Sequence, residues 1–229
     1  MNVLLFGATG MVGQGVLREC LLDRGVESVT AIGRSTTGVS HPKLREIVHA
    51  DLINYEPVES QLSGFDACFF CLGISSAGLN EELYSRITYD ITLRAAETIA
   101  RLNPNLTFAY VSGQGTDSSE HGRIMWARVK GRTENALLRL PFKAAFMFRP
   151  GIIVPRFGAR SRTALYRIPY MLTRLSQSRA HHGSNRPGHA PRRPQRRAQI
   201  DSRNRRHSLS AQQQSRRRPP KSSELKARS

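Results

Sequence analysis

Three glycines spaced three residues apart follow the apolar run Val3–Phe6 and open a helix-like stretch. Without a Cβ atom, Gly7 permits a tight turn, Gly10 lets a phosphate approach the backbone, and Gly13 lets a helix pack closely on a sheet. The N–H groups and dipole of a helix N-terminus attract phosphate. The spacing therefore predicts a turn that binds a dinucleotide pyrophosphate rather than a purely structural turn. The expected contacts on this turn are Gly7, Thr9, Gly10, Met11, Val12 and Gly13.

The next apolar run, Val29–Ile32, is followed by a basic residue where many dinucleotide-binding proteins have an acidic one. A carboxylate at this point would accept hydrogen bonds from the adenosine ribose of NAD. Here the residue is Arg34, with Ser35 and Thr36 beside it and no carboxylate before Glu46. A guanidinium pairs strongly with phosphate. The sequence therefore favours NADP, with NAD as the alternative cofactor and a solvated surface arginine as the alternative interpretation.

Two further pairs of residues follow predicted strands. Asp51 and Leu52 come after the third strand, where an acidic side chain can reach the adenine amino group, although aspartates are common in loops. Leu72 and Gly73 end the fourth strand, where a glycine lets the backbone run beside the nicotinamide ribose. We expect all four residues to contact the cofactor.

The elements that must position these residues alternate along the first 150 residues. Short apolar runs separated by helix-like stretches are typical of βαβ units and a parallel sheet. The runs are continuously apolar, as expected when helices cover both faces. The predicted fold is α/β, a Rossmann-type doubly wound parallel sheet. Expected strands are Val3–Phe6, Val29–Ile32, Glu46–His49, Ala67–Leu72, Thr107–Ser112 and Ala144–Arg149, and expected helices are Gln14–Asp23, Glu81–Leu102 and Trp126–Leu138.

Taken together, these motifs resemble the atypical short-chain dehydrogenase/reductases over residues 1 to about 170. Within that superfamily the chain is similar to the NAD(P)-binding, epimerase-like branch related to the HIV Tat-interacting-protein family. The matching residues are the glycines of Gly7–Gly13, Gly33-Arg34, Asp51-Leu52, Cys71-Leu72-Gly73, Val111-Ser112, Lys130-Gly131 and Arg149-Pro150-Gly151.

The resemblance implies a catalytic Ser after the fifth strand and a Tyr-x-x-x-Lys on the next helix. In such a site the Tyr is the general acid, the Lys holds the ribose and lowers the phenol pKa, and the Ser orients a carbonyl. Ser112 and Lys130 match, but Trp126 occupies the tyrosine position. An indole donates a hydrogen bond but does not exchange a proton near neutral pH. Three candidate substitutes for the acid are Tyr89, Tyr110 and His121.

Two functions are consistent with this site. The first is an NADP-binding oxidoreductase acting on a small carbonyl or alcohol substrate, with Ser112, Lys130 and Trp126 in the site. The alternative is a catalytically inactive, dinucleotide-binding regulatory protein, which the missing tyrosine favours. The segment Arg156–Leu175 carries an amphipathic pattern expected of a substrate pocket, a core contact or a homodimer contact.

Cysteine usage and hydropathy indicate a cytoplasmic protein. The spacing of Cys68 and Cys71 matches a C-x-x-C motif, but both lie in one apolar strand that directs them to opposite faces. We therefore expect buried apolar packing rather than a metal or redox site. The chain shows no signal peptide and no apolar window of the roughly 20 residues that cross a membrane.

The last quarter of the chain carries most of the charge. Of the 35 Lys and Arg residues, 16 lie in residues 174–229, against only 2 of the 17 Asp and Glu. We assign residues 1–175 to the NAD(P)-binding domain and expect 176–229 to be a disordered basic tail. The tail lacks interleaved aromatic residues, so no specific nucleic-acid binding is expected. Its arginines would support sequence-independent binding to nucleic acid or to an anionic membrane, which is a third functional hypothesis.

A frameshift is a second hypothesis for this tail. Codons can be chosen for Gln199–Ser208 such that a one-base shift reads Lys-Ser-Ile-Leu-Glu-Ile-Ala-Asp-Ile, which resembles the last strand of similar proteins. In that case the tail has replaced the last helix and an edge strand.

Overall fold

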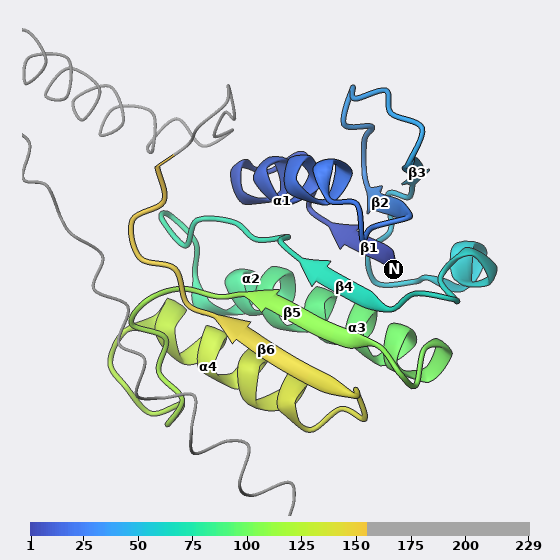
Figure 1. Cartoon of the computed structure of the whole chain (residues 1–229). Coiled ribbons are helices and arrows are strands. Elements are labelled where there is room, and N and C mark those ends of the chain that lie inside the picture. The colour runs from blue at the N-terminus through green and yellow to red at the C-terminus, as the bar shows by residue number, and fades with distance from the viewer. Residues whose placement is uncertain (155–229) are drawn as a thin grey trace, which may run out of the picture. The chain divides into compact units, whose positions relative to one another are not determined.

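The computed structural model describes residues 1–154, which form a parallel sheet in the order β3-β2-β1-β4-β5-β6 (Figure 1). The strand order reverses between β1 and β4, and at such a switch point a crevice opens at the carboxyl ends of the strands. The doubly wound order confirms the predicted Rossmann-type fold. The strands are β1 (Asn2–Phe6), β2 (Ser28–Gly33), β3 (Leu44–Val48), β4 (Ala67–Phe70), β5 (Thr107–Val111) and β6 (Ala144–Phe148).

Helices lie on both faces of the sheet. The helical elements are α1 (Met11–Leu22), the 3₁₀ turn η1 (Glu56–Gln61), α2 (Glu81–Ser85), the π-helical stretch η2 (Arg86–Asp90), α3 (Ile91–Leu102) and α4 (Met125–Leu138). The first helix begins three residues before the predicted Gln14, because Gly10 is already its N-cap. The long helix predicted over Glu81–Leu102 is present as α2, η2 and α3 in succession. The spacing of its apolar residues did not indicate the π-helical stretch η2.

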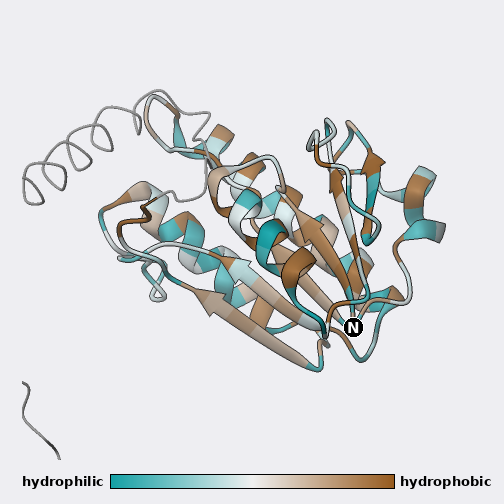
Figure 2. Ribbon diagram, turned by 45° about the horizontal axis from the view of Figure 1, so that its top comes forward, coloured by the Kyte–Doolittle hydropathy of each residue, from teal (hydrophilic) through white to brown (hydrophobic). Residues whose placement is uncertain are grey.

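Side chains of each strand alternate between two apolar clusters. Leu4 and Phe6 of β1 pack with α3 on one face, whereas Val3 and Leu5 pack with α1 on the other. Figure 2 shows the strands as predominantly hydrophobic ribbons between helices of mixed character. Cys68 of β4 and Cys71, which follows the strand, show the same alternation. Cys68 lies in the cluster under α3, and Cys71 packs against the cluster under α1. The predicted orientation of these cysteines to opposite faces is confirmed.

Three predictions fall on residues 155–229 and lie outside the described residues: the amphipathic segment Arg156–Leu175, the disordered basic tail 176–229 and its frameshifted origin. Among the helices of residues 1–154, none has the length and apolarity that a membrane crossing requires.

Candidate dinucleotide-binding site

The glycine turn lies between the end of β1 and the start of α1, as predicted. Gly7 has φ +74°, and a Cβ there would stand 2.7 Å from the backbone nitrogen of Leu72. A Cβ on Gly13 would stand 2.0 Å from the carbonyl oxygen of Gly7. Both distances are far inside van der Waals contact, so the two positions require glycine. The turn is thus held against the end of β4 on one side and against the first turn of α1 on the other.

The N-terminus of α1 is open toward the crevice. Gly10 is the N-cap and brings no side chain to bond the first N–H groups of the helix. Its own N–H donates to the carbonyl of Gly7 at 2.9 Å, and its carbonyl accepts from Gln14 at 2.8 Å, which closes the turn. The amides of the first helical residues, Met11 and Val12, therefore stay available for ligand oxygens with the positive end of the helix dipole behind them.

A cleft of about 510 Å³ lies in front of this turn. It gathers eight of the predicted cofactor residues from the ends of four segments: Gly7, Thr9, Gly10, Met11, Arg34, Leu52, Leu72 and Gly73. Val12 and Gly13 lie behind it, in the helix. The volume falls within the range of small-molecule and cofactor sites.

Arg34 stands at the cleft beside Ser35, at the carboxyl end of β2. Its side chain is exposed, and within residues 1–154 it has no hydrogen-bond or ion-pair partner. The cleft also contains Glu46 of β3, whose carboxylate accepts a hydrogen bond from the N–H of Thr37 at 2.6 Å. Sequence reasoning did not assign Glu46 to the site. The parallel register that pairs it with Ala31 of β2 brings it there.

Asp51 stabilises its own loop. Its Oδ1 accepts hydrogen bonds from the N–H groups of Ile53 and Asn54, at 2.9 and 3.2 Å, and these bonds lower the pKa of the carboxyl. Its neighbour Leu52 lines the cleft, whereas Asp51 is not among the lining residues. Asp51 is thus bonded to its own loop and does not line the cleft. Its predicted contact with adenine stays a prediction.

The three predicted catalytic residues meet around Gly113. Ser112 directly follows β5 and is buried, and Gly113 comes next. Built on Gly113, a Cβ would lie 3.8 Å from the Trp126 ring and 4.0 Å from Cδ of Lys130, which places both α4 side chains at the loop that leaves Ser112. The spacing of four residues puts Trp126 and Lys130 on one face of the helix, as expected.

Ser112 is already engaged. Its Oγ lies 2.9 Å from Oγ1 of Thr116, which itself donates to the carbonyl of Gly113 at 2.7 Å. Because each hydroxyl carries one hydrogen, Ser112 is the donor to Thr116 and keeps its lone pairs for accepting. Donation to a substrate carbonyl requires this bond to Thr116 to break.

Lys130 is the group in this site whose charge is most affected by its surroundings. Burial lowers the pKa of its ammonium to about 8, and the neighbouring carboxylate of Glu134 opposes part of that shift. Its Nζ lies 5.3 Å from the centroid of the Tyr110 ring. An amine with a pKa near 8 exchanges protons close to neutral pH, which an ordinary lysine does not.

The three alternative proton donors stand in different surroundings. Tyr110 is 1% exposed in the core, and burial raises its pKa far above neutral. Tyr89 packs its ring 4.2 Å from the guanidinium carbon of Arg132, a contact on a different side of α4 from Trp126. His121 is exposed in the loop before α4, and its backbone N–H donates to Ser119. Of the three, Tyr110 lies beside Lys130, but its burial and raised pKa disfavour proton transfer. All three stay candidates for the acid.

The loop between Ser112 and α4 packs closely against the helix and is held by a hydrogen bond of its own. A Cβ on Gly131 would stand 1.7 Å from the carbonyl oxygen of Asp117, so the loop crosses the helix at a position that only glycine allows. The Asp117 carboxylate in turn accepts from the N–H of Gly122 at 2.6 Å. In the motif Lys130-Gly131, the lysine therefore lies in the site, and the glycine allows the loop that follows Ser112 to pack against α4.

An ion pair between Arg149, which follows β6, and a buried carboxylate of α4 connects the sheet to the same helix. Arg149 donates from Nε to both carboxylate oxygens of Glu134 at 3.1 Å and from Nη2 to one of them at 2.5 Å. The Glu134 side chain is 3% exposed. The arginine of the motif Arg149-Pro150-Gly151 therefore has a structural partner that the sequence did not reveal.

The fold and site define a dinucleotide-binding protein of the Rossmann class. The chain belongs to the NAD(P)H-binding family, whose model matches residues 7–134. This match confirms the NAD(P)-binding part of the resemblance.

The chain is also similar in sequence to two relatives. Protein HTATIP2 of Rattus norvegicus is 27% identical over 156 residues, covering 67% of this chain and 63% of the relative. Protein FMP52-2, mitochondrial, of Scheffersomyces stipitis is 28% identical over 156 residues, covering 67% and 66%. The alignments thus span slightly less than two thirds of each relative's length.

Two solved structures show the same fold. The UDP-glucuronic acid 4-epimerase from Bacillus cereus in complex with NAD superposes with a TM-score of 0.52 at 15% identity, covering 66% of this chain and 56% of that one. MoeE5 in complex with UDP-glucose and NAD gives 0.52 at 19% identity, covering 65% and 54%. At these identities the likeness concerns the fold alone.

Proposed function

We propose that this protein binds NADP(H) in the cleft at Gly7–Gly13 and acts as an oxidoreductase on a small carbonyl or alcohol. The observation that carries the proposal is the obligatory glycine turn with an open helix N-terminus, because a Cβ would fill the space at Gly7 and Gly13. The residues present therefore fit a dinucleotide. Its pyrophosphate would lie against the amides of Met11 and Val12, and its adenosine end toward Arg34.

The preference for NADP is supported by the guanidinium of Arg34, which stands at the cleft without a partner among residues 1–154. The test is a fluorescence titration of NADPH and NADH into the wild-type chain, Arg34→Ala and Arg45→Ala. Arg45 is an exposed arginine on the neighbouring strand that does not line the cleft, so it controls for general charge. A charge-assisted phosphate contact contributes about 1.5–3 kcal/mol, so we expect Arg34→Ala to weaken NADPH binding by roughly 10- to 100-fold. Equal losses for NADH and NADPH would exclude the 2′-phosphate role.

The proposed chemistry uses Ser112, Lys130 and Trp126. When bound, the nicotinamide would donate hydride to a carbonyl or accept it from an alcohol, and water would supply or take up the proton in place of the missing phenol. Lys130 holds the cofactor ribose and contributes positive charge, Ser112 orients the substrate oxygen, and the Trp126 indole can donate one hydrogen bond. Turnover is measured by absorbance of the reduced nicotinamide with a panel of small aldehydes, ketones and quinones. We expect turnover with at least one of them, and loss of that turnover in Lys130→Ala.

A second function, dinucleotide-dependent regulation without turnover, is favoured by Trp126 in place of the acid. The same two measurements separate the candidates. NADPH binding with turnover that depends on Lys130 supports the oxidoreductase. Tight NADPH binding with no turnover across the panel supports the regulatory protein, and absence of binding contradicts both.

We also propose that the protein works in the cytoplasm. The fungal relatives carry the word mitochondrial in their names, which makes the organelle the alternative. Cell fractionation with an antibody to the native chain tests the location, and enrichment with mitochondria contradicts the proposal.

A further inference from the structure

The two faces of the sheet are covered unequally by the described residues. On one face α3 and α4 pack over Phe70, Phe108 and Tyr110, all of which are almost fully buried. On the other face only α1 packs on the sheet, and the strands beyond it are open. Phe146 and Phe148 of β6 point to this open face and are 54% and 57% exposed. Two phenylalanines side by side on one strand present more apolar surface than scattered surface residues do.

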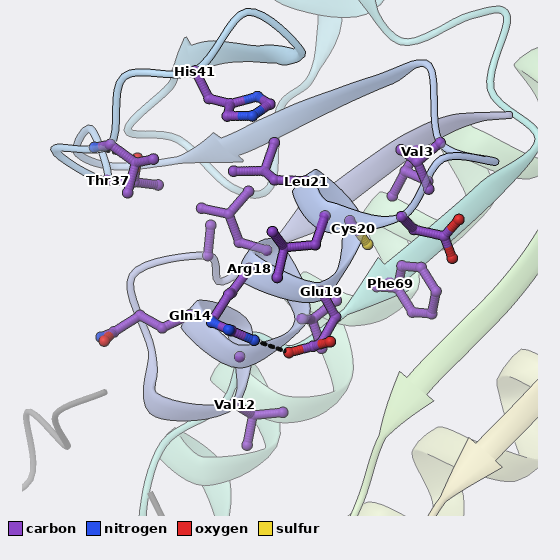
Figure 3. A pocket seen from close by; sticks show the side chains of 18 of the residues that line it. Val3, Val12, Gln14, Arg18, Glu19, Cys20, Leu21, Thr37, His41 and Phe69 are labelled. Carbon is purple, nitrogen blue, oxygen red and sulfur yellow. Dashed lines mark hydrogen bonds and ion pairs between the residues drawn. The ribbon is translucent and has the colours of Figure 1, made fainter. Parts of the chain in front are cut away.

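An apolar groove leads from α1 toward that open face. It has a volume of about 1200 Å³. Figure 3 shows Val12, Cys20 and Leu21 of α1 around it together with Phe69 of β4. Ile153 and Val154, which follow β6, line the same groove. The groove therefore extends from α1 to Ile153 and Val154, the last residues that the structure describes.

Residues beyond Val154 have a pattern that suits this face. Leu165, Ile168, Leu172 and Leu175 recur at helical spacing, and Arg167 and Arg174 fall on the opposite side of such a helix. Pro169 interrupts the pattern and would kink a helix there, so the stripe is expected to curve. The segment therefore offers an apolar side for the groove and a basic side for water.

The position of the segment in the chain favours it over a second copy. It begins a few residues after Val154, which already lines the groove. A short tether gives an effective concentration on the order of millimolar, which exceeds the concentration of free chains in an ordinary solution. Burial of the exposed phenylalanines supplies the driving force.

We propose that residues 157–175 pack their apolar side onto the face formed by Phe69, Phe146 and Phe148 and into the groove beside α1. The segment then completes the second layer of the sheet and forms an intramolecular interface independent of cofactor binding. The occupant is this chain's own segment rather than another molecule.

The first experiment is disulfide trapping in the full-length chain. Phe146→Cys is combined in turn with substitutions on the apolar side of the segment, Leu165→Cys, Ile168→Cys, Leu172→Cys and Leu175→Cys. Matched controls combine it with Arg167→Cys and Arg174→Cys, and Phe146→Cys alone measures the background of the native cysteines. We expect mild oxidation to give an intramolecular link in at least one apolar pair and in neither control, identified by mass spectrometry of linked peptides.

Two results would overturn the proposal. Links between two chains, increasing with protein concentration, would identify a second copy as the occupant. Links in no apolar pair, or equally in the arginine controls, would show that the segment does not lie on this face. Hydrogen exchange of the wild-type chain gives an answer even if the variants fail to fold. We expect the amides of 164–175 to exchange at least about tenfold more slowly than those of 200–229, and equal rates would contradict the proposal.

Discussion

The two halves of the sheet carry different parts of the pattern expected of a dehydrogenase. The half built from β1, β2 and β3 keeps the glycine turn, the open end of α1 and an arginine at the cleft. The half built from β4, β5 and β6 keeps Ser112 and Lys130 but has Trp126 beside them. The proposed cofactor binding and proton transfer are therefore separable, because backbone geometry would carry the first and one side chain the second. The variants below act on one half at a time.

The largest expected effect is that of Gly13→Ala in the cofactor half. A Cβ at this position would stand 2.0 Å from the carbonyl oxygen of Gly7, so the turn and the start of α1 must separate. We expect destabilisation of about 4 kcal/mol or more, with loss of NADPH binding. Gly15→Ala in the same helix meets no atom within 4 Å and is the matched control. It should be neutral or stabilise by up to about 1 kcal/mol. Urea unfolding measures both, and equal effects would contradict the role of Gly13.

Arg149→Ala acts on the other half. It leaves the Glu134 carboxylate buried without its partner, and we expect a loss of about 2–4 kcal/mol in the free energy of unfolding. Arg139→Ala at the exposed C-cap of α4 controls for the loss of a surface charge and should change stability by less than about 0.5 kcal/mol. An Arg149 variant as stable as the control would show that the ion pair contributes nothing to folding.

Trp126→Tyr restores the acid that the second half lacks. A positioned general acid contributes about 10²–10⁴ in rate, so we expect turnover to rise at least about 100-fold on any substrate that the wild-type chain converts. Trp126→Phe offers a ring without a hydroxyl and should not increase turnover. NADPH affinity should be the same in all three chains. If Tyr and Phe behave alike, the missing phenol does not limit the reaction.

Lys130→Met tests the buried ammonium through the pH dependence of stability. The folded pKa of about 8 lies below the unfolded value of 10.5, so the folded state disfavours the charged form. Between these values the unfolded chain binds more protons, and wild-type stability rises as pH increases from 8 to 10.5. At pH 7 the variant should therefore exceed the wild type by about 1–3 kcal/mol, and the difference should shrink by pH 10.5. Unfolding curves at both pH values measure this, and a difference independent of pH would contradict a lowered pKa.

The sequence was sufficient for the features that local geometry dictates. The glycine turn follows from residue types at fixed spacing, because only a residue without a Cβ fits where the backbone comes close to itself. Trp126 and Lys130 were placed on one face of a helix for the same reason, since helical periodicity is local. The sheet and its two clusters follow from the apolar runs.

The features that the sequence did not reveal depend on contacts between distant segments. Glu46 reaches the cleft through the register of β3 on β2. Glu134 was not singled out from the sequence, because its partner Arg149 follows it only after another strand. The engagement of Ser112 by Thr116 depends on the path of a loop, which propensity does not determine. The exposure of Phe146 was equally hidden, because the pattern of a strand does not state which face a helix covers.

A crystal structure of the full-length chain with NADPH tests the central claim most directly. The account predicts that the pyrophosphate oxygens lie about 3 Å from the amides of Met11 and Val12, with the 2′-phosphate beside Arg34 and the nicotinamide toward Lys130. A dinucleotide bound elsewhere on the molecule, or a cleft at Gly7–Gly13 that holds only solvent at saturating NADPH, would contradict it.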